Sequence, residues 1–327
     1  MRRILHRPEF GAACGVIAIW LFFSFYAGGS GFLSWAGSAT YLEIASELGI
    51  LAAAVSLLMI AGEFDLSVGS MIAASGMTIS LLCEQWGWSI WAGIAVAMVL
   101  SLAVGLANGL VVVRTGLPSF IVTLGSLFIL SGGTIGMTRL ITGRTQVGGL
   151  HEALHYSSAQ AVFASRIGGF SISILWWVAI TALATWVLLR TRFGNWIFGA
   201  GGAPDAARNL GVPVRRVKIA LFMTTSLCAC LIATFQAVKF TGSDVLRGTG
   251  KELEAILAAV LGGTLLTGGH GSVVGAAFGA LLFGMVQQGI VFAGVDSDWY
   301  KVFLGAMLII AVLVNTYVRG RMVEARR

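Results

Sequence analysis

The sequence contains few charged residues. Lys, Arg, Asp and Glu together make up 11% of its 327 residues, whereas a soluble domain carries about 25%. So few charges cannot cover the surface of a soluble fold of this length, which excludes an ordinary globular protein. Disorder is excluded too, because apolar residues account for 57% of the chain and disordered segments contain few of them. The 44 glycines show no three-residue period, which excludes collagen.

Other missing features exclude several kinds of site. The four cysteines include no C-x-x-C pair, so neither a disulfide framework nor a zinc ribbon is indicated. The string nearest to a phosphate-binding loop, residues 248–252, has no Ser or Thr after its Lys. We therefore expect that this chain binds no cofactor and does not hydrolyse ATP itself. The net charge is +7, but the basic residues are not interleaved with aromatics on one face, so no nucleic-acid partner is expected.

Long apolar stretches dominate what is present, and the mean hydropathy is +0.90. A helix that crosses a bilayer needs about 20 largely apolar residues. We therefore predict an all-α, polytopic membrane protein in which residues 1–327 form a single transmembrane domain of about ten helices. The predicted spans are 10–27, 42–61, 68–83, 88–112, 119–137, 172–189, 217–239, 254–268, 272–293 and 301–318.

The basic residues predict that both termini are cytoplasmic, because Lys and Arg concentrate on the inner side of membrane proteins. With ten spans, 14 basic residues fall on that side: Arg2, Arg3, Arg7, Arg114, Arg190, Arg192, Arg208, Arg215, Arg216, Lys218, Arg319, Arg321, Arg326 and Arg327. Seven fall outside: Arg139, Arg144, Arg166, Lys239, Arg247, Lys251 and Lys301. Two loops are long, an outer loop at about 138–171 and a basic inner loop at about 190–216.

Small residues indicate where helices pack closely, since helices in lipid associate through such contacts. Two series recur every four residues: Gly271, Gly275 and Gly279, and Ser101, Gly105 and Gly109. Glycines also interrupt apolar segments at 62–69 and 262–271. Broken segments at matching places in two halves of a transporter can mark the transport path.

Residues 151–155 read His151-Glu152-Ala153-Leu154-His155. On a helix this pattern places two His on one face to bind zinc, with Glu152 as the general base. The alternative function is therefore an integral-membrane zinc metalloprotease that uses His151, Glu152 and His155. The string lies in the predicted outer loop, and no neighbouring residue is placed to be the third ligand, so a chance match is the competing interpretation.

Acidic residues lie at both ends of the second predicted span. Glu43 and Glu47 are four residues apart at its outer end, where they reach either the lipid headgroups or a polar vestibule. Asp65 follows its inner end and precedes Ser67. A carboxylate there is typical of a helix N-cap, because it accepts hydrogen bonds from unpaired amides. We therefore predict that Asp65 starts the third span.

The inner loop contains one short predicted helix. Pro followed by Asp favours a helix start, and a later Gly favours its end. The segment consists of Pro204, Asp205, Ala206, Ala207, Arg208, Asn209, Leu210 and Gly211. Basic residues flank it on both sides, so it is either an anchor at the membrane surface or a docking element for a cytoplasmic partner.

Several motifs, in order along the chain, resemble the permease subunits of ABC importers for simple sugars, the ribose/xylose/arabinose permease family. The resemblance extends from about Leu48 to Val318. The motifs are 61–70 (AGEFDLSVGS), 117–125 (LPSFIVTLG), 191–194 (TRFG) with 206–208 (AAR) and 211–212 (GV), and 250–256 (GKELEAI) with 262–264 (GGT) and 268–273 (GGHGSV).

This resemblance implies a multi-pass protein of the bacterial inner membrane that translocates a monosaccharide or a related polyol. It implies three protein partners: a periplasmic sugar-binding protein, a second permease copy or homologue, and a cytoplasmic ATPase that binds ATP and Mg. It makes 204–211 the coupling element and Asp65, Ser67 and Gly69 part of a structural motif. From polarity and position, the predicted translocation path contains Asn108, Ser119, Phe120, Thr123 and Gln287.

Overall fold

The computed structural model describes residues 8–296, 298–300, 302–303, 305–306 and 309–310. Within these residues, seven helical segments are long and apolar enough to cross a membrane. They are α2 (Pro8–Ala27) with the π-helical turn η1 (Gly28–Phe32), α3 (Trp35–Ile60), α5 (Ile90–Thr115), α6 (Ser119–Thr142), α8 (Ser173–Arg190), α11 (Val214–Lys239) and α13 (Val273–Phe292). A mainly helical membrane protein is thereby confirmed.

The remaining elements do not combine the length and apolar character of those seven. The helices are α4 (Val68–Trp86), α7 (Tyr156–Phe163), α9 (Arg192–Gly202), α10 (Pro204–Asn209) and α12 (Lys251–Leu261), with a 3-10 turn η2 (Leu150–Glu152). Two antiparallel ribbons were not predicted. β1 (Gln146–Gly148) pairs with β4 (Gly242–Asp244), placing Val147 opposite Ser243. β2 (Arg166–Ile167) pairs with β3 (Phe170–Ser171) in a hairpin.

Two predicted segments differ from the structure. The stretch 254–268 is not one helix, because α12 ends at Leu261 after 11 residues, which span about 16 Å of a hydrocarbon core of about 30 Å. The predicted outer loop at 138–171 is shorter, since α6 continues to Thr142, and it contains α7. The tenth span at 301–318 lies largely outside the described residues.

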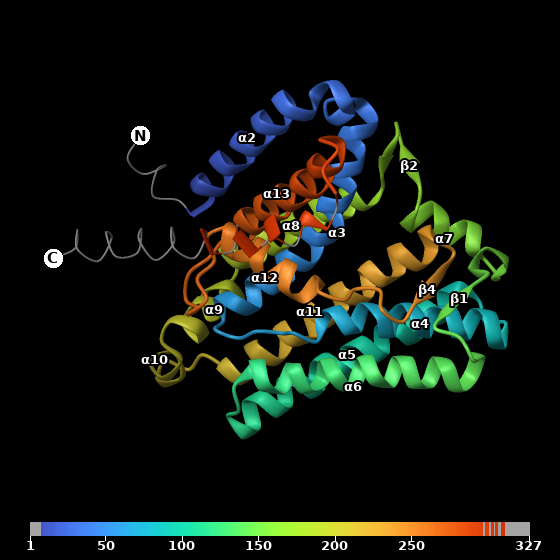
Figure 1. The fold of residues 1–327 in the computed structure, drawn as a ribbon. Helices are drawn as coiled ribbons and strands as arrows, with labels where there is room; N and C mark the ends of the chain where they lie inside the picture. The colour runs from blue at the N-terminus through green and yellow to red at the C-terminus, as the bar shows by residue number, and fades with distance from the viewer. Residues whose placement is uncertain (1–7, 297, 301, 304, 307–308, 311–327) are drawn as a thin grey trace.

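Figure 1 shows how the helices are layered. The largely buried α3 packs against α8, α11, α12 and α13, whereas α6 lies at the edge of the bundle. Helices α9 and α10 lie at one end of the molecule, which we call the α10 end. Helix α7 and the strands β1, β2 and β4 lie at the opposite end, the α7 end. Long helices connect the two ends.

Glycines bring neighbouring helices into backbone contact, as the sequence predicted. A methyl group at Gly105 of α5 would lie 2.7 Å from Cα of Met223 on α11. Gly279 of α13 faces the backbone of Ala258 on α12 in the same way. By contrast, a methyl group at Gly125 of α6 would meet no atom within 4 Å among the described residues.

We predict that Gly105→Ala destabilises the protein, because the added methyl group forces α5 and α11 apart. Overpacking of this kind costs about 1–3 kcal/mol. Thermal unfolding of the detergent-solubilised protein measures the effect as a lower Tm. Gly125→Ala is the matched control and should leave Tm unchanged or slightly raised. Equal Tm values for the two variants would contradict the close contact.

Candidate functional site

The chain between α3 and α4 is not helical. It crosses the interior of the protein over residues 61–67. The hydrocarbon core of a bilayer offers no water to satisfy backbone groups, so protein groups must do so. Ser119 Oγ of α6 accepts a hydrogen bond from the Phe64 amide at 3.0 Å, and Thr123 Oγ1 accepts one from the Leu66 amide at 3.1 Å. The side chains of α6 therefore stabilise this non-helical segment, which we call the break.

Asp65 is the centre of the break and is fully buried. Its Oδ1 accepts hydrogen bonds from the Ser67 amide at 3.0 Å and the Ser67 hydroxyl at 2.6 Å. Its Oδ2 accepts one from Thr225 Oγ1 of α11 at 2.6 Å. No Lys, Arg or His among the described residues lies within ion-pair distance of this carboxylate. Hydroxyl and amide groups alone compensate for its burial.

The prediction that Asp65 caps the helix of the third span is therefore wrong. α4 begins at Val68, its N-cap is Ser67, and no side chain caps the first turn. Asp65 bonds instead to the residue before the helix and to α11, which lies 160 positions further along the chain. Gly69 has a separate role, because a side chain there would collide with the backbone of Gly248 and the carboxylate of Glu252.

The structure divides the five residues of the predicted path into three groups. Asn108, Ser119 and Thr123 are buried, and all three bond to the break, since Asn108 Nδ2 donates to Ser67 Oγ at 3.0 Å. Phe120 is 53% exposed on the outside of α6. Gln287 lies in a separate cavity. The five side chains do not line one continuous surface.

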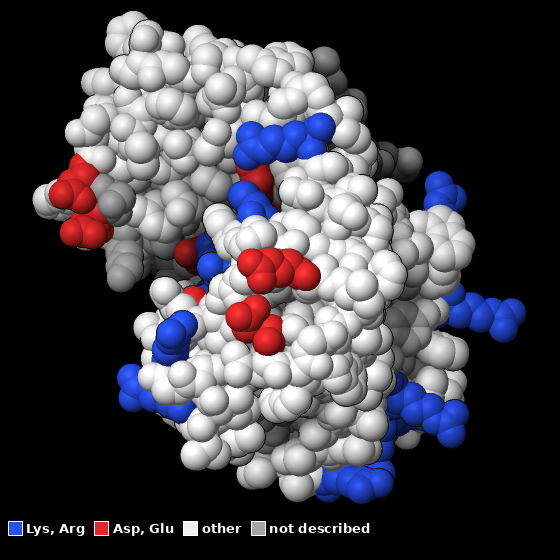
Figure 2. Space-filling view, turned by 90° about the vertical axis from the view of Figure 1, so that its right-hand side faces the viewer, with Lys and Arg blue, Asp and Glu red and all other residues white. Residues whose placement is uncertain are grey.

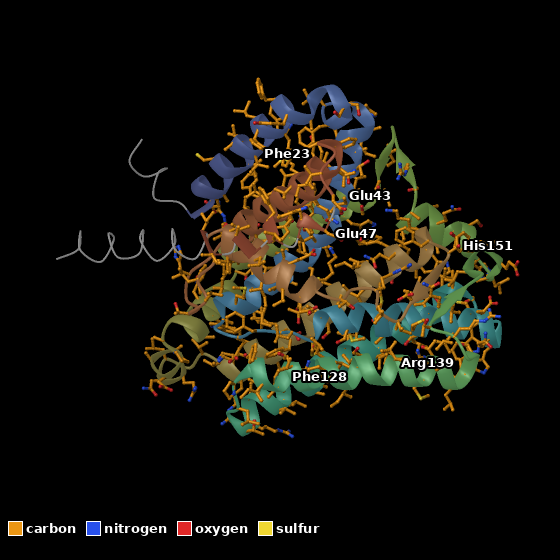
Figure 3. The ribbon with its side chains drawn as sticks, in the orientation of Figure 1. Phe23, Glu43, Glu47, Phe128, Arg139 and His151 are labelled. Carbon is orange, nitrogen blue, oxygen red and sulfur yellow. The ribbon has the colours of Figure 1, made fainter. Side chains whose placement is uncertain are left out.

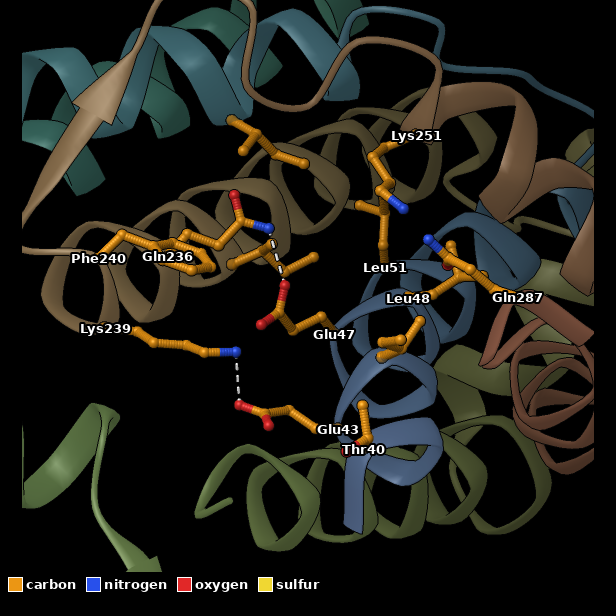
Figure 4. A pocket seen from close by; sticks show the side chains of 13 residues that line it. Thr40, Glu43, Glu47, Leu48, Leu51, Gln236, Lys239, Phe240, Lys251 and Gln287 are labelled. Carbon is orange, nitrogen blue, oxygen red and sulfur yellow. Dashed lines mark hydrogen bonds and ion pairs between the residues drawn. The ribbon is translucent and has the colours of Figure 1, made fainter. Parts of the chain in front are cut away.

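That cavity lies between the halves of α3 and α11 nearest the α7 end (Figure 4). Its volume is about 250 Å³. Side chains from α3, α4, α11 and α13 line it. Lys251, the first residue of α12, and Phe240, which directly follows α11, complete the lining. The lining residues are Thr40, Glu43, Ile44, Glu47, Leu48, Leu51, Ile72, Ile232, Gln236, Lys239, Phe240, Lys251 and Gln287.

The charged groups of the cavity are paired within the protein. Glu43 forms ion pairs with Lys239 at 2.6 Å and with Arg166 of β2 at 3.2 Å. Glu47 accepts a hydrogen bond from the Gln236 amide nitrogen at 2.7 Å. Thus Glu43 and Glu47, which the sequence assigned either to headgroups or to a vestibule, lie inside a polar vestibule. Ionisable groups at such a depth are costly and usually functional.

The cavity changes from polar to apolar along its length. At its mouth, Phe240 is 55% exposed and the Lys239 side chain is 32% exposed. At its floor, Leu51 and Ile232 are only 1% and 3% exposed. Figure 2, which looks onto the α7 end, shows a hollow between two bodies of protein where basic and acidic side chains lie together. The cavity therefore opens toward the α7 end and is closed by aliphatic side chains.

Arg247 supports the cavity from the loop after β4. Its guanidinium donates to the backbone oxygen of Gly242 at 2.8 Å and lies over the Phe240 ring, 4.7 Å from the centroid. Burial lowers the pKa of Arg247, while the nearby carboxylates of Asp244 and Glu47 act in the opposite direction. An arginine normally titrates far above neutrality, so Arg247 remains cationic at pH 7.

The zinc-site hypothesis does not fit the structure. His151 and Glu152 belong to η2, which ends at Glu152, and His155 has a left-handed backbone with φ of 65°. The two His therefore do not share a helical face, the arrangement on which the motif depends. The described residues contain no group of three His, Cys, Asp or Glu side chains that could hold a metal. Figure 3 shows His151 at the α7 end, far from Glu43 and Glu47.

The predicted coupling segment forms an exposed helix at the α10 end. α10 runs from Pro204 to Asn209, and within it Arg208 pairs with Asp205 at 3.3 Å. Leu210, just after the helix, is 85% exposed. Ala207 alone is buried, and it packs in the cluster that includes Ala200 of α9. A partner protein could therefore reach nearly the whole segment.

Glycines connect this end to the break at 61–67 and to a second break, the non-helical residues 262–272 between α12 and α13. Gly201, in the last turn of α9, has so little space that a methyl group would collide with the Ile60 carbonyl at the end of α3. Gly268, in the break after α12, would place a methyl group 2.8 Å from Cα of Gly62. The Gly269 amide donates to the Ile60 carbonyl at 2.8 Å. The two breaks and the end of α9 thus meet at one point.

We predict that Thr225→Val destabilises the protein, because it removes a hydrogen-bond donor from buried Asp65. Hydrogen bonds to charged groups contribute about 1.5–3 kcal/mol. Thr224→Val is the matched control, since the Thr224 hydroxyl donates only to the Ala220 carbonyl of its own helix. Thermal unfolding should give a lower Tm for Thr225→Val alone. A similar loss in both variants would show that Asp65 does not depend on Thr225.

The chain resembles known permeases over most of its length. Residues 38–312 match the family described as branched-chain amino acid transport system / permease component. The ribose import permease protein RbsC of Escherichia coli K12 is 32% identical over 84% of this chain and 84% of its own. The xylose transport system permease protein XylH of the same strain is 30% identical over 97% of this chain and 94% of its own.

A third relative, the probable ABC transporter permease protein YphD of Escherichia coli K12, is 31% identical over 98% of this chain and 93% of its own. No solved structure matches the chain. A broken-helix membrane bundle with these matches along nearly its whole length leaves one assignment: the chain belongs to this family of ABC-transporter permease components, multi-pass proteins of the bacterial inner membrane.

Proposed function

We propose that this chain is the membrane-spanning subunit of an ABC importer for a simple sugar or related polyol. One observation carries this proposal: the chain matches a ribose permease over 84% and a xylose permease over 97% of its length. In the proposed assembly a periplasmic binding protein delivers the sugar, a separate cytoplasmic ATPase binds ATP and Mg²⁺, and a second permease copy or homologue completes the membrane part.

The proposed orientation places the α10 end in the cytoplasm and the α7 end in the periplasm. The excess of basic residues supports it, because Arg190, Arg192, Arg208, Arg215 and Arg216 all lie in or beside α9 and α10. Such an excess is typical of cytoplasmic loops. The cavity between α3 and α11 then opens toward the binding protein, and α10 faces the ATPase.

The proposed coupling runs from α10 to the two breaks. An ATPase that moves α10 also moves α9, since Ala207 packs in one cluster with Ala200 and Ile197 of that helix. The end of α9 lies against Ile60, which precedes the first break, and against Gly269, which lies within the second. Extended segments change their backbone angles more readily than packed helices, and such positions absorb hinge motion. Movement at α10 would therefore reorient α3 relative to α12 and α13.

In this proposal the three buried path residues act on the break. The hydrogen bonds of Asn108, Ser119 and Thr123 connect α5 and α6 to residues 64–67. When the break moves, α5 and α6 therefore move with it. Phe120 lies on the exposed side of α6, and its role on the path stays a prediction. Gln287 belongs to the vestibule.

The proposed substrate class is tested by uptake in cells that lack only this chain. We expect loss of uptake of at least one neutral pentose, hexose or polyol, and restoration by the wild-type chain. Radiolabelled D-ribose, D-xylose and L-leucine form the smallest useful panel. Loss of L-leucine uptake with normal sugar uptake would overturn the sugar assignment, while leaving the chain a permease.

Docking of the ATPase on α10 is tested by exchanging its two charges. In Asp205→Arg/Arg208→Glu the pair inside the helix can still form, but the surface offered to a partner is reversed. Removing a charge from such an interface costs about 2–5 kcal/mol. We therefore expect uptake to fall by at least about tenfold, equivalent to ~1.4 kcal/mol, with an unchanged amount of protein in the membrane.

Arg144→Glu is the control for this exchange, because Arg144 is an exposed arginine at the α7 end. The ATPase should copurify with Arg144→Glu and much less with the exchanged variant. Normal uptake and normal copurification in the exchanged variant would show that α10 is not the docking element.

A further inference from the structure

We propose that the cavity between α3 and α11 is a binding site for one neutral, polyhydroxylated molecule within this single chain. The inference rests on the proposed function and specifies where the sugar first meets the permease. Four observations support it: an unpaired buried amide oxygen, the bonding of the charged groups within the protein, the volume, and the change from polar to apolar lining.

The first observation concerns Gln236, which is 8% exposed. Its amide nitrogen donates to Glu47, but its amide oxygen has no hydrogen-bond partner in the described part of the chain. A buried acceptor without a partner costs about 1–3 kcal/mol. The side chain lines the cavity, and a ligand hydroxyl that donates to this oxygen would remove that cost. A hydroxyl also accepts, which suits the ammonium group of Lys251 across the cavity.

The second observation is the balance of charge. The two carboxylates and two ammonium groups that line the cavity have formal charges that sum to zero. Glu43 is paired with Lys239 and Arg166, Lys251 is paired with Glu254 at 2.6 Å, and Glu47 is bonded to Gln236. An amino acid zwitterion would compete with these pairs for the same charged groups. A neutral polyol can add hydrogen bonds to each of them without separating any charge.

The third and fourth observations concern size and shape. The volume of about 250 Å³ lies just below the range of about 300–1,000 Å³ typical of small-molecule sites, which suits one monosaccharide and not an oligosaccharide. Thr40, Glu43 and Lys239 provide polar groups at the mouth, whereas Leu51, Ile72 and Ile232 form an apolar floor. A hydrated molecule can therefore enter from the α7 end, and it cannot pass the floor unless α3 and α11 move apart.

Two neighbouring residues of α13 give a matched test. Gln287 lines the cavity and Gln288 does not, and both are half-buried. We would make Gln287→Cys and Gln288→Cys and label whole cells with a membrane-impermeant thiol reagent. The wild-type chain, with its four native cysteines, provides the background. Labelling is then repeated in the presence of D-ribose, D-xylose, a polyol panel and L-leucine.

The expected result is labelling of Gln287→Cys from outside the cell, slowed by the transported sugar and not by L-leucine. Because protection scales as 1 + [L]/Kd, a sugar present at ten times its Kd should slow labelling about tenfold. Labelling of Gln288→Cys should not depend on sugar. Adding Gln236→Leu to Gln287→Cys should abolish protection while the cysteine remains reactive.

The possible failures are distinguishable. If cells take up a sugar normally but no sugar slows labelling of Gln287→Cys, or if the reagent cannot reach it, the site is overturned and the proposed function stands. Protection by L-leucine alone would also overturn the site. If a sugar protects Gln287→Cys but uptake of that sugar does not require this chain, the site stands and the proposed function fails.

Discussion

A chain that leaves helical geometry inside a bilayer has to supply partners for its own backbone, because lipid supplies none. Residues 61–67 meet this requirement with side chains from α6, and side chains from α11 bond to the acidic residues of the same segment. Ser119 and Thr123 of α6 bond to backbone amides, and Thr225 of α11 bonds to Asp65. The Lys218 side chain of α11 pairs with Glu63. The break is therefore also what fixes α3, α4, α6 and α11 relative to one another.

The same break connects the two ends of the molecule. α3 begins near the cavity mouth and ends at Ile60, where the break starts. Its 26 residues extend about 39 Å at 1.5 Å per residue. The end of α9 and the second break both contact its last carbonyl. A displacement at the α10 end can therefore be transmitted to Glu43 and Glu47 by movement of α3 as a single rigid helix.

Sequence predicted the parts that depend on local composition. Hydropathy located α2, α3, α5, α6, α8, α11 and α13, because a long apolar run has few other solutions in lipid. It placed one helix across 254–268, because a glycine-rich apolar stretch has the same composition whether it is helical or extended. It gave Asp65 a local partner, since Thr225 is distant in sequence. It placed Ser119 and Thr123 on the translocation path from their polarity and position, but their bonds to the amides of Phe64 and Leu66 depend on tertiary packing.

The sequence could not predict the cavity either, because the cavity depends on how α3 and α11 face each other. The same facing arrangement decides which ligand the cavity can bind. The spacing of Glu43 and Glu47 on α3, and of Gln236 and Lys239 on α11, predicts one polar stripe on each helix. It does not predict that the stripes face each other. Once they do, Lys239 pairs with Glu43 and the Gln236 amide bonds to Glu47, so the protein itself compensates both carboxylates and no ligand charge is needed. Such a site gains only hydrogen bonds from a neutral sugar, and weak binding allows the sugar to leave toward the next part of the path.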